Sequence, residues 1–284
     1  MTIQNHIPSC RTLLTAIAML TAIGLSPLSA QRYEAYIDSA DNYVAHERYA
    51  DAARCYREAL KTNPASPLNS KIFANLGICL TETRQYGLAL EAFDVALVRE
   101  PDSPSILTSR ARTYLHTNNT EDAITDLNSA LHTDSLYLPA LRLRGHLHLL
   151  NSDYDAAKSD FGSICRHYPD DETGITGLAS CYDRLADYPK AIKLYRKALS
   201  ISDEQDTNVA LAGALINNNQ LSEAREALRE AIQHHPRCAE LYLMRGVLHQ
   251  RMFKPEEAAT DKKTALNLGA DPELADRLIP SKKH

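Results

Sequence analysis

The sequence predicts an all-α fold in which about seven helix-turn-helix repeats stack into a solenoid. Two periodic features carry this prediction. Alanine recurs every 33 to 37 residues, at Ala52, Ala89, Ala123, Ala157, Ala191, Ala224 and Ala258. Gly or Ala stands twelve residues before each of these, at Ala40, Gly77, Ala111, Gly145, Ala179, Ala212 and Gly246. A period in this range is typical of arrays of stacked supersecondary units.

Each repeat is expected to contain two antiparallel helices that approach closely where both carry small side chains. Large residues fill the remaining space on the second helix, at Tyr56, Phe93, Leu127, Phe161, Tyr195 and Leu228. Tyrosine marks the turn between the helices at Tyr49, Tyr86, Tyr154 and Tyr188. Proline, which lacks an amide hydrogen, follows the second helix at Pro64, Pro101, Pro169 and Pro236. The 38 alanines and the absence of tryptophan agree with closely packed helices.

With these positions, the stretch from Tyr49 to Leu60 and the stretch from Phe73 to Pro101 resemble the tetratricopeptide repeat family. The resemblance implies a right-handed α-solenoid with repeats at about 33–66, 70–103, 104–137, 138–171, 172–204, 205–238 and 239–272. The chain departs from the family pattern in lacking its tryptophan and in placing Lys262 where an apolar residue is expected. Residues 273–284 are expected to form a short C-terminal cap and tail, with Asp271 and Pro272 at the start of a helix.

Residues 1–30 have the layout of a secretory signal peptide. Arg11 precedes an uncharged run from Leu13 to Leu25, and Ser26-Pro27-Leu28-Ser29-Ala30 follows. The run has 13 residues, fewer than the roughly 20 that cross a bilayer as a helix. We therefore expect cleavage after Ala30, export to a periplasm or cell envelope, and no transmembrane anchor.

The aligned repeats reveal a charge covariation. Arginine and aspartate stand sixteen residues apart at Arg110 and Asp126, at Arg144 and Asp160, and at Arg245 and Asp261. In the other repeats both positions are uncharged, as at Leu178 and Leu194. We predict an interhelical ion pair within the third, fourth and seventh repeats, so these arginines have a structural role.

Five cysteines follow the expected signal peptide, and none forms a C-x-x-C pair typical of zinc or redox sites. Small buried hydrophobic roles are expected for them. Export permits disulfides, and if any pair forms we expect Cys165 with Cys181.

Candidate binding residues lie on the first helices, because the resemblance implies that these helices line the concave surface on which peptides or partner helices bind. Basic side chains gather there in the third to fifth repeats, at Arg112, His116, Arg142, His146 and Arg184. We therefore expect a non-catalytic scaffold that binds a protein or peptide on this groove, and the basic side chains favour an acidic one. A solvated face with scattered charge remains an alternative.

Other function classes stay open or are disfavoured. One alternative is a small-ligand or enzymatic site around Arg112, Arg142 and His146; another is a spacer that self-associates. The formal charge of −5 disfavours general nucleic-acid binding. Neither a phosphate-cradling glycine loop nor a nucleophile elbow occurs, and His46-Glu47 lacks the second histidine of a metalloprotease motif. No catalytic residue, cofactor or metal is therefore expected.

Overall fold

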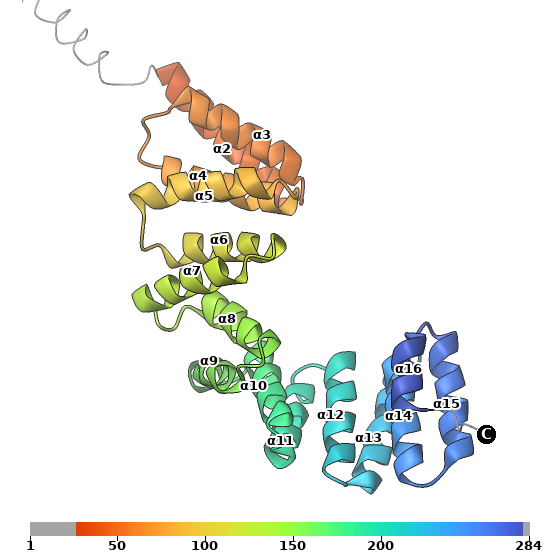
Figure 1. Cartoon of the computed structure of the whole chain (residues 1–284). Coiled ribbons are helices and arrows are strands. Elements are labelled where there is room, and N and C mark those ends of the chain that lie inside the picture. Colours follow the sequence, from red (N-terminus) through yellow and green to blue (C-terminus); the bar gives the residue numbers. More distant parts are fainter. Residues whose placement is uncertain (1–26, 281–284) are drawn as a thin grey trace, which may run out of the picture. The chain divides into compact units, whose positions relative to one another are not determined.

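The computed structural model describes residues 27–280, and every regular element in that range is a helix (Figure 1). The helices are α2 (Pro27–Ala45), α3 (Tyr49–Thr62), α4 (Asn69–Glu82), α5 (Tyr86–Arg99), α6 (Pro104–His116), α7 (Thr120–Thr133), α8 (Leu138–Leu150), α9 (Tyr154–His167), α10 (Glu172–Arg184), α11 (Tyr188–Leu199), α12 (Gln205–Asn217), α13 (Leu221–His234), α14 (Ala239–Arg251), α15 (Pro255–Asn267) and α16 (Pro272–Leu278). Successive pairs from α2/α3 to α14/α15 form the helix-turn-helix repeats. The predicted fold class is confirmed.

Most of the expected signal peptide lies outside the described residues. Its last four residues, 27–30, form the first turn of α2.

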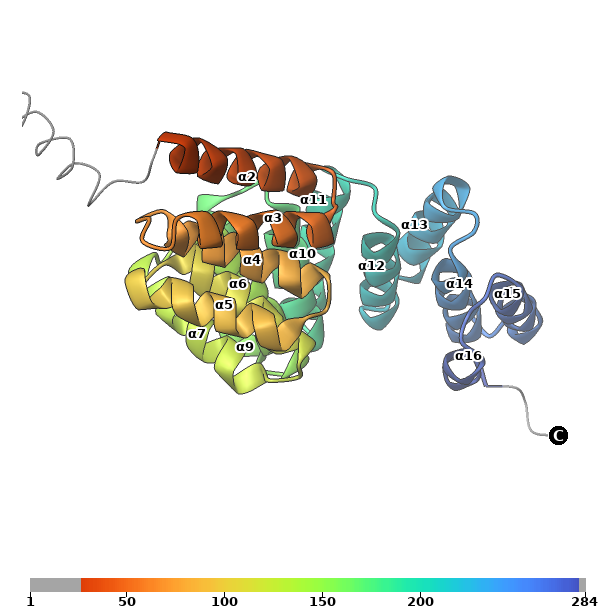
Figure 2. The same cartoon turned by 90° about the horizontal axis from the view of Figure 1, so that it is seen from above.

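The chain divides into two compact units, which we treat separately. The N-terminal unit ends at Ser135 and the C-terminal unit begins at Leu136. Within the C-terminal unit, Figure 2 shows the α12/α13 and α14/α15 pairs as neighbours, with α16 beside α14.

The periodic small residues form the core of each repeat. Each of the seven recurring alanines from Ala52 to Ala258 is at most 1% exposed. The glycines make room for aromatic rings rather than for alanine alone: a Cβ atom on Gly77 would lie 2.8 Å from the Phe93 ring, and one on Gly145 would lie 2.9 Å from the Phe161 ring. Where the first helix has alanine, the second-helix residue is leucine in two repeats, at Leu127 and Leu228, and tyrosine in two others, at Tyr56 and Tyr195. The two repeats whose second helix carries phenylalanine both have glycine at the facing position of the first helix.

The three predicted interhelical ion pairs are confirmed. Nε and Nη2 of Arg144 donate to the two carboxylate oxygens of Asp160 at 2.9 and 2.6 Å. Arg110 binds Asp126 in the same way at 2.8 and 2.7 Å, and it also bonds to Asp94. The third pair joins Arg245 to Asp261, with a shortest distance of 2.6 Å. Each aspartate side chain is at most 7% exposed, so the charge lies inside the repeat.

All seven turns within the repeats share one backbone geometry. Each contains a non-glycine residue with φ between 57° and 61°, at Glu47, Arg84, Asn118, Ser152, Ala186, Asn219 and Phe253. The amide of the next residue donates to a carbonyl five residues earlier, as Gln85 does to Leu80 at 2.8 Å. This bond is that of a Schellman motif, which ends the first helix and turns the chain back.

The C-terminal segment completes the seventh repeat. Here Lys262 occupies the position of the large second-helix residue, and Ile279 fills the vacant space instead. Ile279 is 3% exposed, and a Cβ atom on Gly246 would lie 2.3 Å from its Cδ1. Lys262 donates to the Ile279 carbonyl at 2.8 Å and pairs with Asp276 at 2.5 Å. The side chain of Asp271 accepts from the Leu274 amide at 2.8 Å and caps α16.

All five described cysteines are free thiols, Cys165 and Cys181 included. The conditional pairing of these two is therefore not formed in the structure. Burial raises the pKa of both Cys79 and Cys181 to about 11, in keeping with a role as small core residues.

Candidate functional site

First helices of neighbouring repeats pack side by side within each unit. In the N-terminal unit α4 contacts α6, and in the C-terminal unit α8 contacts α10, α10 contacts α12, and α12 contacts α14. Second helices make no comparable contacts with one another within residues 27–280. The first helices α4 and α6 of the N-terminal unit, and α8, α10, α12 and α14 of the C-terminal unit, therefore form continuous surfaces, and second helices leave room between them.

The five predicted binding residues belong to two separate groups. Arg112 and His116 lie on α6 in the N-terminal unit, whereas Arg142, His146 and Arg184 lie on α8 and α10 in the C-terminal unit. The contacts of each set are therefore those within its own unit.

Arg142 already has a partner within the C-terminal unit. Its guanidinium forms an ion pair with Asp171, whose side chain is 6% exposed. Asp171 also accepts a hydrogen bond from the Gly174 amide at 2.7 Å and so caps α10. Arg142 therefore ties α8 to the start of α10, a role that sequence analysis did not predict.

The two histidines are exposed on their helices and make local contacts. His116 stacks on the ring of Tyr86, with centroids 5.3 Å apart and planes 8° from parallel. His146 packs edge-on against Phe161 at 5.2 Å, and its Nδ1 lies 2.7 Å from the Arg142 carbonyl.

Arg112 and Arg184 are exposed, and neither forms an ion pair within residues 27–280. The carboxylate of Asp183 lies next to Arg184 in the sequence. Its Oδ1 is buried without a hydrogen-bond partner in the described part of the chain. Desolvation raises the pKa of Asp183, and the charge of Arg184 partly opposes this increase. Two cations on the first helices are thus free to bind an external anion.

The alternative enzymatic site around Arg112, Arg142 and His146 gains no support from this geometry. Within the C-terminal unit, the guanidinium of Arg142 is already paired with Asp171. In the part of the chain that the structure describes, no group of three or more His, Cys, Asp or Glu side chains is arranged to hold a metal ion.

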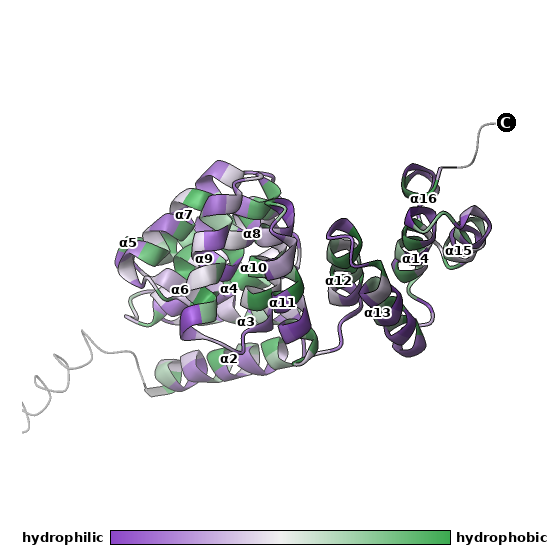
Figure 3. Cartoon of the chain, turned by 90° about the horizontal axis from the view of Figure 1, so that it is seen from below, coloured by the Kyte–Doolittle hydropathy of each residue, from purple (hydrophilic) through white to green (hydrophobic). Residues whose placement is uncertain are grey.

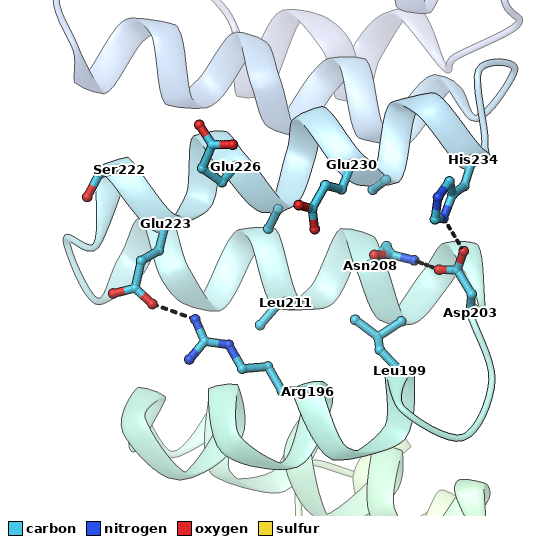
Figure 4. A pocket seen from close by; sticks show the side chains of 12 residues that line it. Arg196, Leu199, Asp203, Asn208, Leu211, Ser222, Glu223, Glu226, Glu230 and His234 are labelled. Carbon is cyan, nitrogen blue, oxygen red and sulfur yellow. Dashed lines mark hydrogen bonds and ion pairs between the residues drawn. The ribbon is translucent and has the colours of Figure 1, made fainter.

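Sequence analysis missed a pocket in the C-terminal unit, on the side of the second helices. It has a volume of about 640 Å³ and lies between α11 and α13, with α12 beneath it (Figure 4). The lining consists of Arg196, Leu199, Asp203, Asn208, Leu211, Ser222, Glu223, Glu226, Ala227, Glu230, Ala231 and His234. The pocket exists because α11 and α13 diverge while both remain packed on α12.

Charged hydrogen bonds fix both ends of this pocket. At one end Arg196 Nη2 donates to Glu223 at 2.5 Å, and this bond lowers the pKa of Glu223. At the other end Asp203 accepts from Asn208 Nδ2 at 2.6 Å and lies 2.7 Å from His234 Nδ1. These two bonds, Asn208 first, lower the pKa of Asp203. Both carboxylates are therefore held in the charged form.

One sequence signal could have revealed the pocket. Glu223, Glu226 and Glu230 follow the spacing i, i+3 and i+7, which places them on one side of α13. Figure 3 shows the contrast between α12, where hydrophobic colour is prominent, and α13, where hydrophilic colour is prominent. The binding residues expected from the sequence all lie on first helices, so this stripe on a second helix was not among them.

Among residues 27–280, no helix combines the length and the apolar character that a membrane span requires.

Comparison with known proteins identifies the family. A tetratricopeptide repeat model matches residues 37–104, 82–137 and 142–207, and a second model of the same description matches residues 184–248. The chain therefore belongs to the tetratricopeptide repeat family, whose members generally mediate protein–protein interactions.

The individual proteins described next share at most 24% sequence identity with the chain. Anaphase-promoting complex subunit 3 of Schizosaccharomyces pombe is 24% identical over 228 residues, which are 80% of this chain and 32% of that subunit. The chain thus spans about a third of the length of this relative. Among solved structures, a tetratricopeptide repeat protein from Parabacteroides merdae aligns with a TM-score of 0.66 at 24% identity, covering 88% of this chain and 98% of that one. YrrB, described as a TPR protein with an unusual peptide-binding site, aligns with a TM-score of 0.55 at 20% identity, covering 66% and 97%. These structural likenesses establish the fold.

Proposed function

We propose that this chain is a non-enzymatic adaptor that binds an extended segment or a helix of another protein on its first-helix surfaces. Family membership supports the general role. The continuous packing of first helices in each unit supports the surface, because a bound segment needs several neighbouring helices to lie on.

The choice of this surface rests on which arginines of the first helices have an ion-pair partner within the chain. Arg110, Arg144 and Arg245 are paired with buried aspartates inside their repeats. Arg112 and Arg184 are exposed and have no such partner in the described residues. An unpaired exposed guanidinium binds carboxylates in bidentate geometry, so we infer that the partner segment is acidic.

The names of two similar proteins agree with this class of function. One relative is a subunit of a multiprotein complex, and one structural neighbour is described as having a peptide-binding site. The proposal assigns to this chain only the common feature, which is recognition of another protein by stacked helical repeats.

We also propose that the protein acts outside the cytoplasm. The uncharged run from Leu13 to Leu25 and the small residues up to Ala30 support export. N-terminal sequencing of the protein recovered from the cell envelope tests this point. A mature chain that begins at Gln31 agrees with it, and a full-length chain in the cytoplasm contradicts it.

Charge reversal tests the binding surface. Arg112→Glu combined with Arg184→Glu should reduce the capture of partner proteins from an envelope extract by about tenfold, because the first-helix surface of each unit would then present a negative charge in place of a positive one to an acidic segment. The matched control is Arg57→Glu with Arg166→Glu, which reverses two exposed arginines on the second helices α3 and α9. Quantitative mass spectrometry of the captured proteins is the measurement. Equal capture by both variants would remove the first-helix arginines from the binding surface.

A further inference from the structure

We propose that the pocket between α11 and α13 binds a lysine or arginine side chain presented by a basic segment of another protein. This site lies on the second-helix side of the C-terminal unit and prefers the opposite charge from the first-helix surface. It therefore stands or fails independently of the proposed function.

The shape and lining of the pocket match a long side chain with a cationic end. Leu199, Leu211, Ala227 and Ala231 supply apolar surface, and Leu211 and Ala231 are at most 5% exposed. Carboxylates stand around this surface, as Figure 4 shows for Glu223, Glu226 and Glu230. Lysine and arginine have apolar stems that pack on such surfaces while the charged end reaches a polar rim.

Asn208 contributes a hydrogen-bond acceptor that no described residue uses. This residue is 9% exposed. Its Nδ2 donates to Asp203 Oδ1 at 2.6 Å and to the Glu204 carbonyl at 3.1 Å, which fixes the orientation of the amide. Its Oδ1 accepts no hydrogen bond in the described structure, and in Figure 4 it lies on the side facing Glu230. This oxygen is therefore open to a donor from a ligand, such as an ammonium or guanidinium group.

The charges of the lining residues also favour a cationic ligand. Four carboxylates line the pocket against one arginine, with His234 as the only other basic group in the lining. Arg196 shows that a guanidinium binds here, because it pairs with Glu223 at the end away from Asn208. Glu226 and Glu230 contact Arg229 of their own helix at 3.0 and 3.6 Å. Those side chains are all more than half exposed, so a ligand can displace Arg229 at small cost.

The acidic stripe is specific to the sixth repeat. The positions of Glu223, Glu226 and Glu230 on α13 are occupied in the preceding repeat by Lys190, Lys193 and Lys197, in the fourth repeat by Ala156, Ser159 and Ser163, and in the seventh by Glu257, Thr260 and Thr264. Structural requirements that all repeats share would give these positions similar residues. Their divergence shows that the stripe is not needed to build a repeat.

Peptides with graded stems provide the first test. Fluorescein-labelled, acetylated and amidated tetrapeptides of lysine, ornithine or diaminobutyrate carry the same charge and differ by one methylene per side chain. Fluorescence anisotropy with the full chain should show that each methylene removed weakens binding about two- to fourfold, as expected for a stem that packs on apolar surface. Equal affinities of the three peptides would overturn the proposal, because general surface attraction does not depend on stem length.

Matched variants provide the second test, with the lysine peptide as the probe. Glu226→Gln with Glu230→Gln should weaken binding at least about tenfold, because both rim charges are lost. Glu91→Gln with Glu121→Gln removes the same charge from exposed sites on α5 and α7 and should leave affinity within about twofold. Equal weakening in both variants would overturn the pocket as the binding site.

A neutral variant separates the pocket from its charge. Ala227→Leu fills the apolar surface without altering net charge, and the fifth repeat already carries Leu194 at this position. It should weaken the lysine peptide about as strongly as the double glutamine variant. Unchanged binding by Ala227→Leu would overturn the proposal. So would wild-type self-association, seen by sedimentation at several concentrations and lost in the double glutamine variant, because the occupant would then be a second copy.

Discussion

The interhelical ion pair of the fourth repeat gives a sharp test of how these repeats are stabilised. Asp160 is 5% exposed and binds Arg144 through both carboxylate oxygens, while the Arg144 side chain is 22% exposed. Asp160→Ala would remove the carboxylate that binds both Nε and Nη2 of Arg144 in a largely buried position. Removing one member of a buried pair costs about 3 to 5 kcal/mol. Because Arg144 can reach solvent in part, we expect a loss of about 2 to 4 kcal/mol.

Replacing both members with leucine should behave differently. Leu178 and Leu194 occupy the same two positions in the fifth repeat, so this backbone already accommodates the apolar pair. Buried ion pairs exchanged for apolar residues of similar volume are often neutral in stability or better. We therefore expect Arg144→Leu with Asp160→Leu to stay within about 1 kcal/mol of the wild type.

Urea unfolding followed by circular dichroism at 222 nm separates the two cases. At a slope of roughly 3 kcal/mol per M, a loss of about 3 kcal/mol lowers the midpoint by about 1 M. The double variant should keep its midpoint within about 0.3 M of the wild type. Equal losses in the single and double variants would refute the reasoning, because the cost would then come from altered packing and not from loss of the buried carboxylate that pairs with Arg144.

Three further predictions concern the core and the C-terminal cap. Gly177→Ala should lower the free energy of unfolding by about 1 to 3 kcal/mol, because the new Cβ would lie 2.5 Å from the Phe161 ring. Adding Phe161→Leu should reduce this loss of stability, as measured by urea unfolding. An unchanged loss would argue against a clash with the ring. Ile279→Ala should reduce the local stability of the C-terminal repeat by about 2 to 5 kcal/mol, because it removes a buried side chain. Hydrogen exchange should show faster exchange of the backbone amides in α14 and α15. Unchanged exchange would show that Ile279 is not needed for the stability of this repeat. At pH 8 the pKa of about 11 leaves roughly one Cys79 thiol in a thousand ionised. Iodoacetamide should therefore alkylate the partly exposed Cys55 well before Cys79, as measured by mass spectrometry. Equal alkylation rates would contradict the burial of Cys79.

Within a repeat, the sequence predicted structure down to individual pairs of residues. The repeats serve as an alignment of seven copies, so a requirement of the common backbone shows up as a column of similar residues. Because charge at Arg110 and at Asp126 appears together or not at all in equivalent columns, their contact could be predicted without coordinates. The buried alanines were predictable for the same reason: every copy needs a small residue at that crossing.

Contacts that occur in only one place could not be predicted by comparing equivalent positions among the repeats. The pair of Arg142 with Asp171 joins adjacent repeats in a single place, so no second copy indicates it. Lys262 looked like a defect because the residue that compensates for it, Ile279, lies outside the periodic region. The pocket depends on how far α11 and α13 diverge over α12, a property of packed helices that no column of residues records.

The difference between core positions shared by all repeats and surface positions that vary also bears on where binding sites can form. Core positions are nearly fixed by the need to pack two helices, whereas surface positions of the second helices change sign between adjacent repeats, from the lysines of α11 to the glutamates of α13. A common backbone can therefore present a different chemical surface at each repeat without loss of stability. Binding specificity follows from what distinguishes one repeat from the next, and the acidic stripe on α13 beside an unused acceptor on Asn208 is such a difference.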